Sequence, residues 1–384
     1  MKSAAVKVPF VNLAIQHQPI SQEIEQAVTR GIRRGDFVLG KALKEFESEF
    51  AQACGVKYGV GVASGTDAIT LGLKACGINP GDEILVPANT FIATVIGVSS
   101  AGATPVMVDC VAETALIDLE KAAAAITSKT KGIIPVHLYG QMVSPQQLLD
   151  FAKTYNLIIF EDAAQAHLAS KEGYTAGSVG TAAGFSFYPS KNLGAFGNGG
   201  MLVTQNEAIA KRMQALRNYG APKKYYHTEL GINSRLDTLQ AAILQVKLPS
   251  LAHWNKMRNQ AANYYDKLLA PLALQGIKPI KNLSGQGHVY HLYVIRVDRQ
   301  SGLNRDIIAE KLGERGIQTG IHYPIPCHLQ PAYSYLGYQR GDFPQAETLC
   351  EEILSLPMYP GLTQAEIELV VQELCSVLNL TTAI

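Results

Sequence analysis

One lysine, Lys191, lies in surroundings that favour a reactive amine. Aromatic and small residues surround it in residues 185–194 (FSFYPSKNLG), and no Asp or Glu occurs between Gly173 and Gln205. A poorly solvated lysine has a lowered pKa, and its neutral amine can attack a carbonyl group to form an imine. Because most lysines are solvated surface charges, this prediction depends on what the chain places beside Lys191.

A turn suited to a phosphate group lies earlier in the chain. Ser64, Gly65, Thr66 and Asp67 follow the apolar run Tyr58–Val62 and begin a helical stretch. Free N–H groups and the helix dipole attract anions at such a turn, and Gly65 allows close backbone approach. The same residues also suit an ordinary helix cap, and both interpretations stay open. Gly59 and Gly61 form no dinucleotide-binding fingerprint, because Ser64 occupies the position of the third glycine.

An acidic pair and an aromatic ring follow two further apolar runs. Glu161 and Asp162 come directly after Leu157–Phe160, and Phe91 follows Glu83–Val86. A carboxylate here can hold magnesium, cap a helix or keep a pyridine nitrogen protonated, which makes the ring an electron sink. Asp162 is the acid expected to face inward. Phe91 is either a core residue or a ring that stacks on a flat ligand.

The elements that carry these residues alternate between strand and helix. Helices are predicted over 67–75, 92–100 and 145–155, among seven apolar runs: Tyr58–Val62, Glu83–Val86, Pro105–Val108, Gly132–Val136, Leu157–Phe160, Ala183–Phe187 and Met201–Thr204. Several runs lack polar alternation, as strands buried on both faces do. The pattern predicts an α/β fold with a mostly parallel seven-stranded sheet. Ligands bind beyond the carboxyl ends of such strands, so the four motifs are expected to meet at one edge.

The pattern changes near residue 250. Two long helical segments, Leu236–Leu248 and Leu251–Leu269, precede a shorter α/β stretch that reaches the C-terminus. A chain of 384 residues is longer than one ordinary domain. We therefore predict a large domain over residues 1–250, with the N-terminal segment, and a smaller α/β domain over residues 251–384.

Composition argues against several classes of partner. The net charge of +1 leaves no electrostatic footprint for nucleic acid. No apolar run approaches the roughly 18 residues of a membrane helix, and Lys7 and Pro9 interrupt any signal-peptide core. The six cysteines are widely spaced without a CxxC motif, which indicates free thiols rather than disulfides or a metal site. We expect a cytoplasmic protein that binds no nucleic acid, membrane or metal.

Nearly the whole chain, from about Pro9 to Leu374, resembles the sugar aminotransferases of the DegT/DnrJ/EryC1/StrS family. The matching stretches are residues 64–68 (SGTDA), 89–94 (NTFIAT), 135–141 (PVHLYGQ), 161–167 (EDAAQAH), 186–195 (SFYPSKNLGA), 233–237 (NSRLD) and 322–326 (HYPIP). The resemblance implies a fold type I transferase that uses pyridoxal 5'-phosphate (PLP). It also implies a homodimer whose active sites are shared across the interface.

The resemblance assigns roles to individual residues. Lys191 matches the lysine that holds PLP as a Schiff base, and Asp162 matches the partner of the pyridine nitrogen. Other cofactor-binding positions are matched by Gln165 near the ring hydroxyl, by Phe91 on the ring, by Gly65, Thr66 and Ser186 at the phosphate, and by Asn233 from the second subunit. Substrate-binding positions are matched by Arg235, His322 and Tyr323, again from the partner subunit. Asn198 and Leu168 depart from the family's usual Asp and Gly, and the second departure is expected to change only local packing.

The stretch around Lys191 is most similar to family members that act on dTDP-linked 3-keto-6-deoxyhexoses. No arginine occurs between Gly316 and Gln339, which suits a hydroxyl-rich sugar better than a dicarboxylate that needs an arginine clamp. We expect transamination of such a sugar with L-glutamate as donor, giving an amino sugar for polysaccharide or glycoconjugate synthesis. The alternatives are a 4-keto nucleotide-sugar or amino-cyclitol aminotransferase and a non-catalytic regulatory protein. A dehydratase of the same group would carry histidine in place of Lys191.

Overall fold

One large sheet organises the molecule. The computed structural model describes residues 5–298 and 301–380. Its seven-stranded sheet has the order β1-β9-β8-β5-β4-β2-β3, formed by β1 (Tyr58–Val62), β2 (Glu83–Pro87), β3 (Thr104–Val108), β4 (Thr130–Ile133), β5 (Ile158–Asp162), β8 (Ala182–Ser186) and β9 (Gly200–Thr204). Strand β9 is antiparallel to β1 and β8, and the other pairs are parallel. The predicted α/β fold with a mostly parallel seven-stranded sheet is confirmed.

Helices cover both faces of this sheet because its strands are apolar on both sides. In β9, Leu202 packs into the cluster that contains α4 (Gly65–Ala75), α5 (Ile92–Ala101) and α8 (Glu207–Leu216). Its neighbours Met201 and Val203 pack into the opposite cluster, with α3 (Lys41–Ala53) and α9 (Thr238–Lys247). Each such burial contributes roughly 1.5–3 kcal/mol. The helices α6 (Leu119–Ala124) and α7 (Pro145–Tyr155) add to the first cluster.

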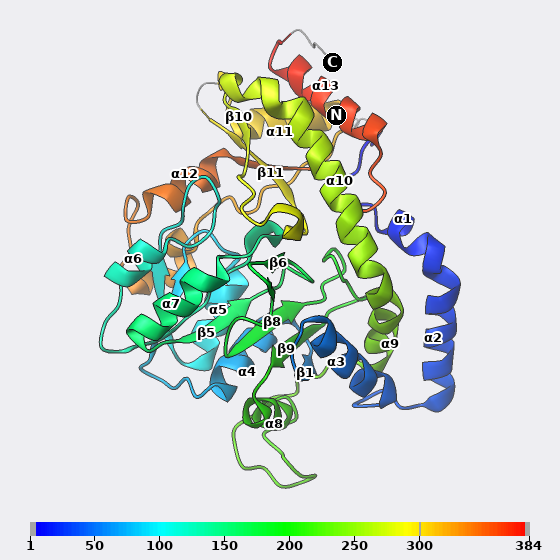
Figure 1. Ribbon diagram of the computed structural model, residues 1–384, viewed down its shortest axis with the longest axis vertical. Coiled ribbons are helices and arrows are strands. Elements are labelled where there is room, and N and C mark those ends of the chain that lie inside the picture. The colour runs from blue at the N-terminus through cyan, green and yellow to red at the C-terminus, as the bar shows by residue number, and fades with distance from the viewer. Residues whose placement is uncertain (1–4, 299–300, 381–384) are drawn as a thin grey trace.

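A second, smaller sheet follows in the C-terminal part. It consists of β10 (Ile277–Pro279), β11 (Tyr293–Val297) and β12 (Ile353–Leu356), all antiparallel. The helices around it are α10 (Leu251–Leu269), α11 (Arg305–Glu314), α12 (Pro344–Glu352) and α13 (Gln364–Val377). Figure 1 shows α10 running from α9, beside the large sheet, to α13 near both chain ends. No helix within residues 5–298 and 301–380 is long and apolar enough to cross a membrane.

The N-terminal segment contacts both parts of the chain. Val8 is buried in the C-terminal core and forms a bridge to Ile317. The helices α1 (Leu13–His17) and α2 (Ser21–Arg34) then lead to the large sheet, where α2 packs against α9. The proposed division near residue 250 stays a prediction, since α10 contributes Leu251 to one core and Tyr265 to the other.

The predicted elements bring the motifs to a common edge. All seven predicted strands are present, and α4, α5 and α7 correspond to the predicted helices at 67–75, 92–100 and 145–155. Strands β1, β2, β5 and β8 share one direction, so their carboxyl ends meet on the same side of the sheet. The motifs at residues 64–67, 89–91, 161–162 and 186–191 lie at these ends or directly beyond them.

Candidate active site

A cavity of about 340 Å³ opens at this edge of the sheet. Nine of the residues predicted for the site line it: Gly65, Thr66, Phe91, Asp162, Gln165, Ser186, Lys191, His322 and Tyr323. A volume of this size suits a small cofactor or substrate. The parallel strands bring together the residues from Gly65 to Lys191, and a C-terminal segment adds His322 and Tyr323.

The N-terminus of α4 forms one end of the cavity. Ser64 caps this helix, because its Oγ accepts the backbone N–H of Asp67 at 3.1 Å. The predicted cap is therefore present, yet within the described chain the N–H groups of Gly65 and Thr66 donate to no protein acceptor. A side chain at Gly65 would collide with Ser186, since its Cβ would lie 2.7 Å from Ser186 Cβ. Two free N–H groups, the helix dipole and nearby hydroxyls make this end an anion site.

Asp162 lies in the floor of the cavity at the end of β5. Its Oδ2 accepts a hydrogen bond from Thr94 Oγ1 at 2.7 Å, and its Oδ1 accepts the backbone N–H of Ala164 at 3.1 Å. Burial raises the pKa of this carboxyl, while the two hydrogen bonds act in the opposite direction. Asp162 is thus a buried carboxylate held in one orientation and directed at the ligand space.

The neighbouring acid, Glu161, points to the other face of the sheet. It is fully buried, and it accepts the backbone N–H groups of Gly177, Val179 and Gly180 at 2.9 Å each. His137 Nε2 lies 3.0 Å from the same carboxylate. The strand alternation separates the two acids, and Asp162 is the one that faces inward, as predicted.

Lys191 follows β8 in a tight turn and projects into the cavity near Asp162. Burial lowers the pKa of its amine to about 8, and the charge of Asp162 partly opposes this shift. Among the described residues, Lys191 Nζ makes no hydrogen bond or ion pair. A substantial fraction of the amine is therefore neutral near physiological pH, and it is free to act as a nucleophile or base.

The remaining wall is built by residues from the C-terminal part of the same chain. Gln165 Nε2 donates to Tyr323 Oη at 3.1 Å, and the Tyr323 ring lies 5.0 Å from the ring of Phe91. His322 is hydrogen-bonded to Ser355 at 2.9 Å, and burial lowers the pKa of its ring to about 4. Neutral hydrogen-bonding groups and aromatic faces therefore line this wall.

This arrangement corrects the prediction that His322 and Tyr323 enter from the partner subunit. The segment that carries them is tied to its own chain at three points. Tyr139 Oη donates to the His322 carbonyl at 2.7 Å, Gly320 pairs with Ser355, and the Cys327 N–H donates to the Ala88 carbonyl at 2.7 Å. These bonds fix both side chains beside the Lys191 of the same chain.

Asn233 and Arg235 do not reach this cavity in their own chain. Asn233 is exposed, and Arg235 donates to Asn218 Oδ1 at 2.8 Å and lies over the ring of Tyr219. Only Ser234 between them turns inward, where its hydroxyl donates to Asp67 at 2.7 Å. The contribution of Asn233 and Arg235 to the site of a partner subunit stays a prediction.

Sequence reasoning assigned no role to several residues of the site. Thr94 lies in a quoted motif, and its hydrogen bond to Asp162 follows only from its place one turn into α5. His291 lines the cavity, but nothing near it in the sequence distinguishes it from an ordinary core histidine. Asn198, where the family often has Asp, also lines the cavity. Leu168 adopts a left-handed φ of 62°, so this departure from Gly introduces local strain as well as altered packing.

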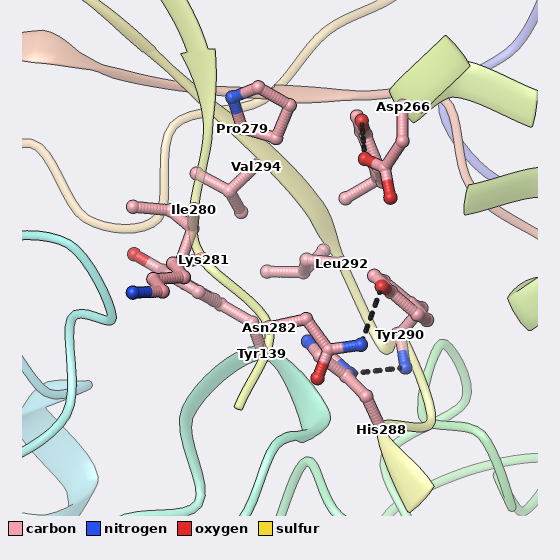
Figure 2. Close-up of a pocket in the computed structure, with 11 residues that line it drawn as sticks. Tyr139, Asp266, Pro279, Ile280, Lys281, Asn282, His288, Tyr290, Leu292 and Val294 are labelled. Atoms are coloured by element: carbon pink, nitrogen blue, oxygen red, sulfur yellow. Dashed lines mark hydrogen bonds between the residues drawn. The ribbon is translucent and has the colours of Figure 1, made fainter. Parts of the chain in front are cut away.

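A second cavity of about 250 Å³ lies behind Tyr139 (Figure 2). In it, Tyr293 Oη donates to Asp266 at 2.6 Å and Asn282 Nδ2 donates to Tyr290 Oη at 3.0 Å. None of the predicted site residues lines this second cavity. The chemistry expected from the sequence belongs to the cavity with Lys191.

The Lys191 cavity fits a phosphorylated pyridine aldehyde. The anion site at α4 suits a phosphate, and the buried carboxylate of Asp162 suits a protonated ring nitrogen. Phe91 is 49% exposed, so its ring face is available to an aromatic ligand. The amine of Lys191 completes the set, because it can bond covalently to an aldehyde carbon.

Comparison with known proteins gives one consistent result. Residues 18–375 match the DegT/DnrJ/EryC1/StrS aminotransferase family. A "Pleiotropic regulatory protein" of Geobacillus stearothermophilus is 42% identical over 96% of this chain and 98% of its own length. The dTDP-3-amino-3,6-dideoxy-alpha-D-galactopyranose transaminase of Aneurinibacillus thermoaerophilus is 45% identical over 95% of this chain and 98% of its own. The structure of ntda from Bacillus subtilis, with bound cofactor pmp, superposes with a TM-score of 0.89 at 34% identity, covering 98% of this chain and 86% of that one.

Proposed function

Because this chain belongs to the DegT/DnrJ/EryC1/StrS aminotransferase family, we propose that it is a PLP-dependent enzyme that aminates a nucleotide-linked keto sugar. This proposal rests on the fold type I architecture and on the aminotransferase chemistry of the family. The proposed substrate is a dTDP-linked 3-keto-6-deoxyhexose, and the proposed donor is L-glutamate. The observation that carries the proposal is the meeting of Lys191, Asp162 and the α4 anion site in one cavity.

Each part of the cavity has a task in this reaction. When bound, PLP supplies an electron-withdrawing ring that carries the amino group between donor and acceptor. Gly65, Thr66 and Ser186 would hold its phosphate, and Asp162 would keep its ring nitrogen protonated. Lys191 would be the covalent attachment point, and its amine would take up and return the proton of the reacting carbon. Its pKa of about 8 suits both directions of proton transfer near neutral pH.

The sugar side of the cavity supports a neutral, hydroxyl-rich acceptor. His322 and Tyr323 offer uncharged hydrogen-bonding groups, because burial lowers the pKa of the former and raises that of the latter. The relative from Aneurinibacillus thermoaerophilus is named for a dTDP-3-amino sugar, which favours the 3-keto position. The sequence around Lys191 favours the same group of substrates.

The test of this proposal is incubation with L-glutamate and a panel of 3-keto and 4-keto sugars linked to dTDP and UDP. Mass spectrometry is expected to detect an amino sugar from the dTDP-linked 3-keto compounds. Conversion of the 4-keto compounds alone would refute the proposed keto position. The regulatory interpretation, which the name of the Geobacillus relative suggests, predicts no conversion and no bleaching of the visible absorbance by glutamate.

We further propose that two copies of the chain form each complete site. The loop that carries Asn233 and Arg235 exposes a row of apolar side chains, among them Tyr225 (84%) and Leu230 (96%). Exposed apolar patches of this kind mark protein–protein contacts. A second copy placed over this loop would receive Asn233 at its phosphate end and Arg235 at its sugar end.

Mixed dimers test this arrangement. A Lys191→Ala chain and an Asn233→Ala/Arg235→Ala chain are each expected to be nearly inactive alone. A purified dimer with one chain of each kind contains one intact site if the sites are shared, and it is expected to recover about half of the wild-type activity per dimer. A mixed dimer as inactive as its two parents would contradict sharing, provided that size-exclusion chromatography shows intact dimers.

A further inference from the structure

Lys247 is a buried lysine that the proposed reaction does not use. It lies at the end of α9, and only 1% of its surface is exposed. Within the described residues it forms no ion pair with a carboxylate. Burial lowers the pKa of its amine to about 7. A buried amine costs free energy of folding unless it is well paired, so its presence here points to a role other than stability.

The contacts of Lys247 lead directly to the turn that carries Lys191. Its Nζ donates to the backbone carbonyl of Gly194 and to His17 Nε2, the latter at 2.8 Å. It also lies 5.5 Å from the centre of the Phe196 ring. Burial and the charge of Lys247 lower the pKa of His17 to about 4, so this ring is neutral at neutral pH and accepts the hydrogen bond.

The turn itself is closed but has few internal bonds. The Lys191 N–H donates to the Tyr188 carbonyl at 2.9 Å, and the Ala195 N–H donates to the Phe187 carbonyl at 2.8 Å. Gly194 has no room for a side chain, because a Cβ there would lie 2.2 Å from the Pro189 carbonyl oxygen. Gly194 therefore packs tightly against the segment that leads to Lys191.

Neighbouring helices hold this turn from two sides. On the α10 side, Asn192 Nδ2 donates to Asn255 Oδ1 at 2.9 Å and to the Val289 carbonyl at 2.8 Å. On the α9 side, Gln240 accepts the Phe196 N–H at 2.8 Å, and the Lys247 amine donates to the Gly194 carbonyl. Loss of Lys247 would leave the Gly194 carbonyl, in a buried site, without this partner.

We propose that Lys247 is a positioning residue, which holds the Lys191 turn through the Gly194 carbonyl and so sets the orientation and solvation of the Lys191 amine. The inference builds on the proposed function, because it assigns importance to the amine of Lys191. A small displacement of a reacting group costs up to about 100-fold in rate. The hydrogen bond from Lys247 to Gly194, three residues from Lys191, can therefore affect turnover although Lys247 does not contact the substrate.

The test compares Lys247→Met, which keeps the volume and removes the hydrogen-bond donor, with Lys247→Arg, which keeps a donor. Lys247→Met is expected to lower kcat by about 10- to 100-fold with little change in KM, and Lys247→Arg is expected to restore part of the loss. The melting temperature of Lys247→Met should change little, because removal of a buried amine whose pKa burial lowers to about 7 offsets the loss of the hydrogen bond to Gly194. Lys256→Met, which alters an exposed lysine of α10, is the matched control.

A second measurement needs neither substrate nor cofactor. Competitive acetylation of the cofactor-free protein, read by peptide mass spectrometry, gives the pKa of Lys191 directly. In Lys247→Met this pKa is expected to rise from about 8 toward the ordinary lysine value, because a looser turn admits water. An unchanged pKa with unchanged kcat, or a loss of kcat that only follows a fall in melting temperature, would overturn the proposal. Failure of wild-type protein to aminate any sugar would instead overturn the proposed function and leave the acetylation result valid.

Discussion

Replacement of Lys191 by alanine is expected to reduce turnover by at least about 10⁴-fold. The variant loses both the covalent attachment point and the amine that moves the proton. The visible absorbance of the lysine-linked cofactor is expected to disappear with the activity. Stopped assays of amino-sugar formation and an absorbance spectrum of the purified protein check the two losses separately.

Two comparisons make the result specific to this amine. Lys153→Ala removes an exposed lysine from α7 and is expected to leave activity and absorbance unchanged. A small primary amine added to the Lys191→Ala variant should restore part of the turnover, because it can occupy the space left by the side chain and take up the proton. Turnover close to the wild-type value in Lys191→Ala would remove Lys191 from the mechanism altogether.

Replacement of Asp162 by asparagine is expected to lower kcat by roughly 10²- to 10³-fold. The amide has the same size and can still accept the hydrogen bond from Thr94, so only the negative charge facing the ring nitrogen is lost. Turnover measured at saturating substrate isolates this effect from changes in binding. Glu161→Gln is the matched control next in sequence, and it should act on folding instead, lowering the free energy of unfolding by about 2–3 kcal/mol.

The hydrogen bond from Thr94 gives the Asp162 prediction a pH dependence. The bond lowers the pKa of Asp162 against the rise caused by burial, so Thr94→Val should raise this pKa further. Activity that requires the carboxylate is lost as the pH falls through that pKa. The acid limb of the kcat/KM profile should therefore move to higher pH in Thr94→Val. An acid limb at the same pH in Thr94→Val and in the wild-type protein would show that a group other than Asp162 controls the loss of activity at low pH.

Much of the fold follows from local patterns in the sequence. The seven apolar runs became seven strands because β-branched and apolar side chains without polar alternation can only be buried on both faces. The strand ends shifted by a few residues; β5, for example, extends to Asp162 where the predicted run ends at Phe160. The position of β9 between β1 and β8, antiparallel to both, is a matter of tertiary pairing and has no local signature.

The placement of a residue beside the cavity was predictable where that residue lies at the end of a strand, whereas the roles that the resemblance implies stay predictions. Gly65, Asp162 and Lys191 are of this kind. The residues that act through long-range contacts were not predictable. His291 lines the cavity from a distant segment, and Tyr139 contacts it only through the His322 carbonyl. Whether residues 322–323 enter from the same chain depends on hydrogen bonds between the C-terminal segment and residues of the large domain.

The two acids at the end of β5 have a consequence for how the enzyme can change. Glu161 secures the turn at 177–180 on one face, while Asp162 serves the ligand on the other. Because a strand sends adjacent side chains in opposite directions, the two carboxylates have separate hydrogen-bond partners. Substitutions near Asp162 are therefore expected to change mainly the reaction. Substitutions near Glu161, on the opposite face, are expected to change mainly the stability of the fold. Strand β5 thus separates residues that support the fold from residues that contact the ligand.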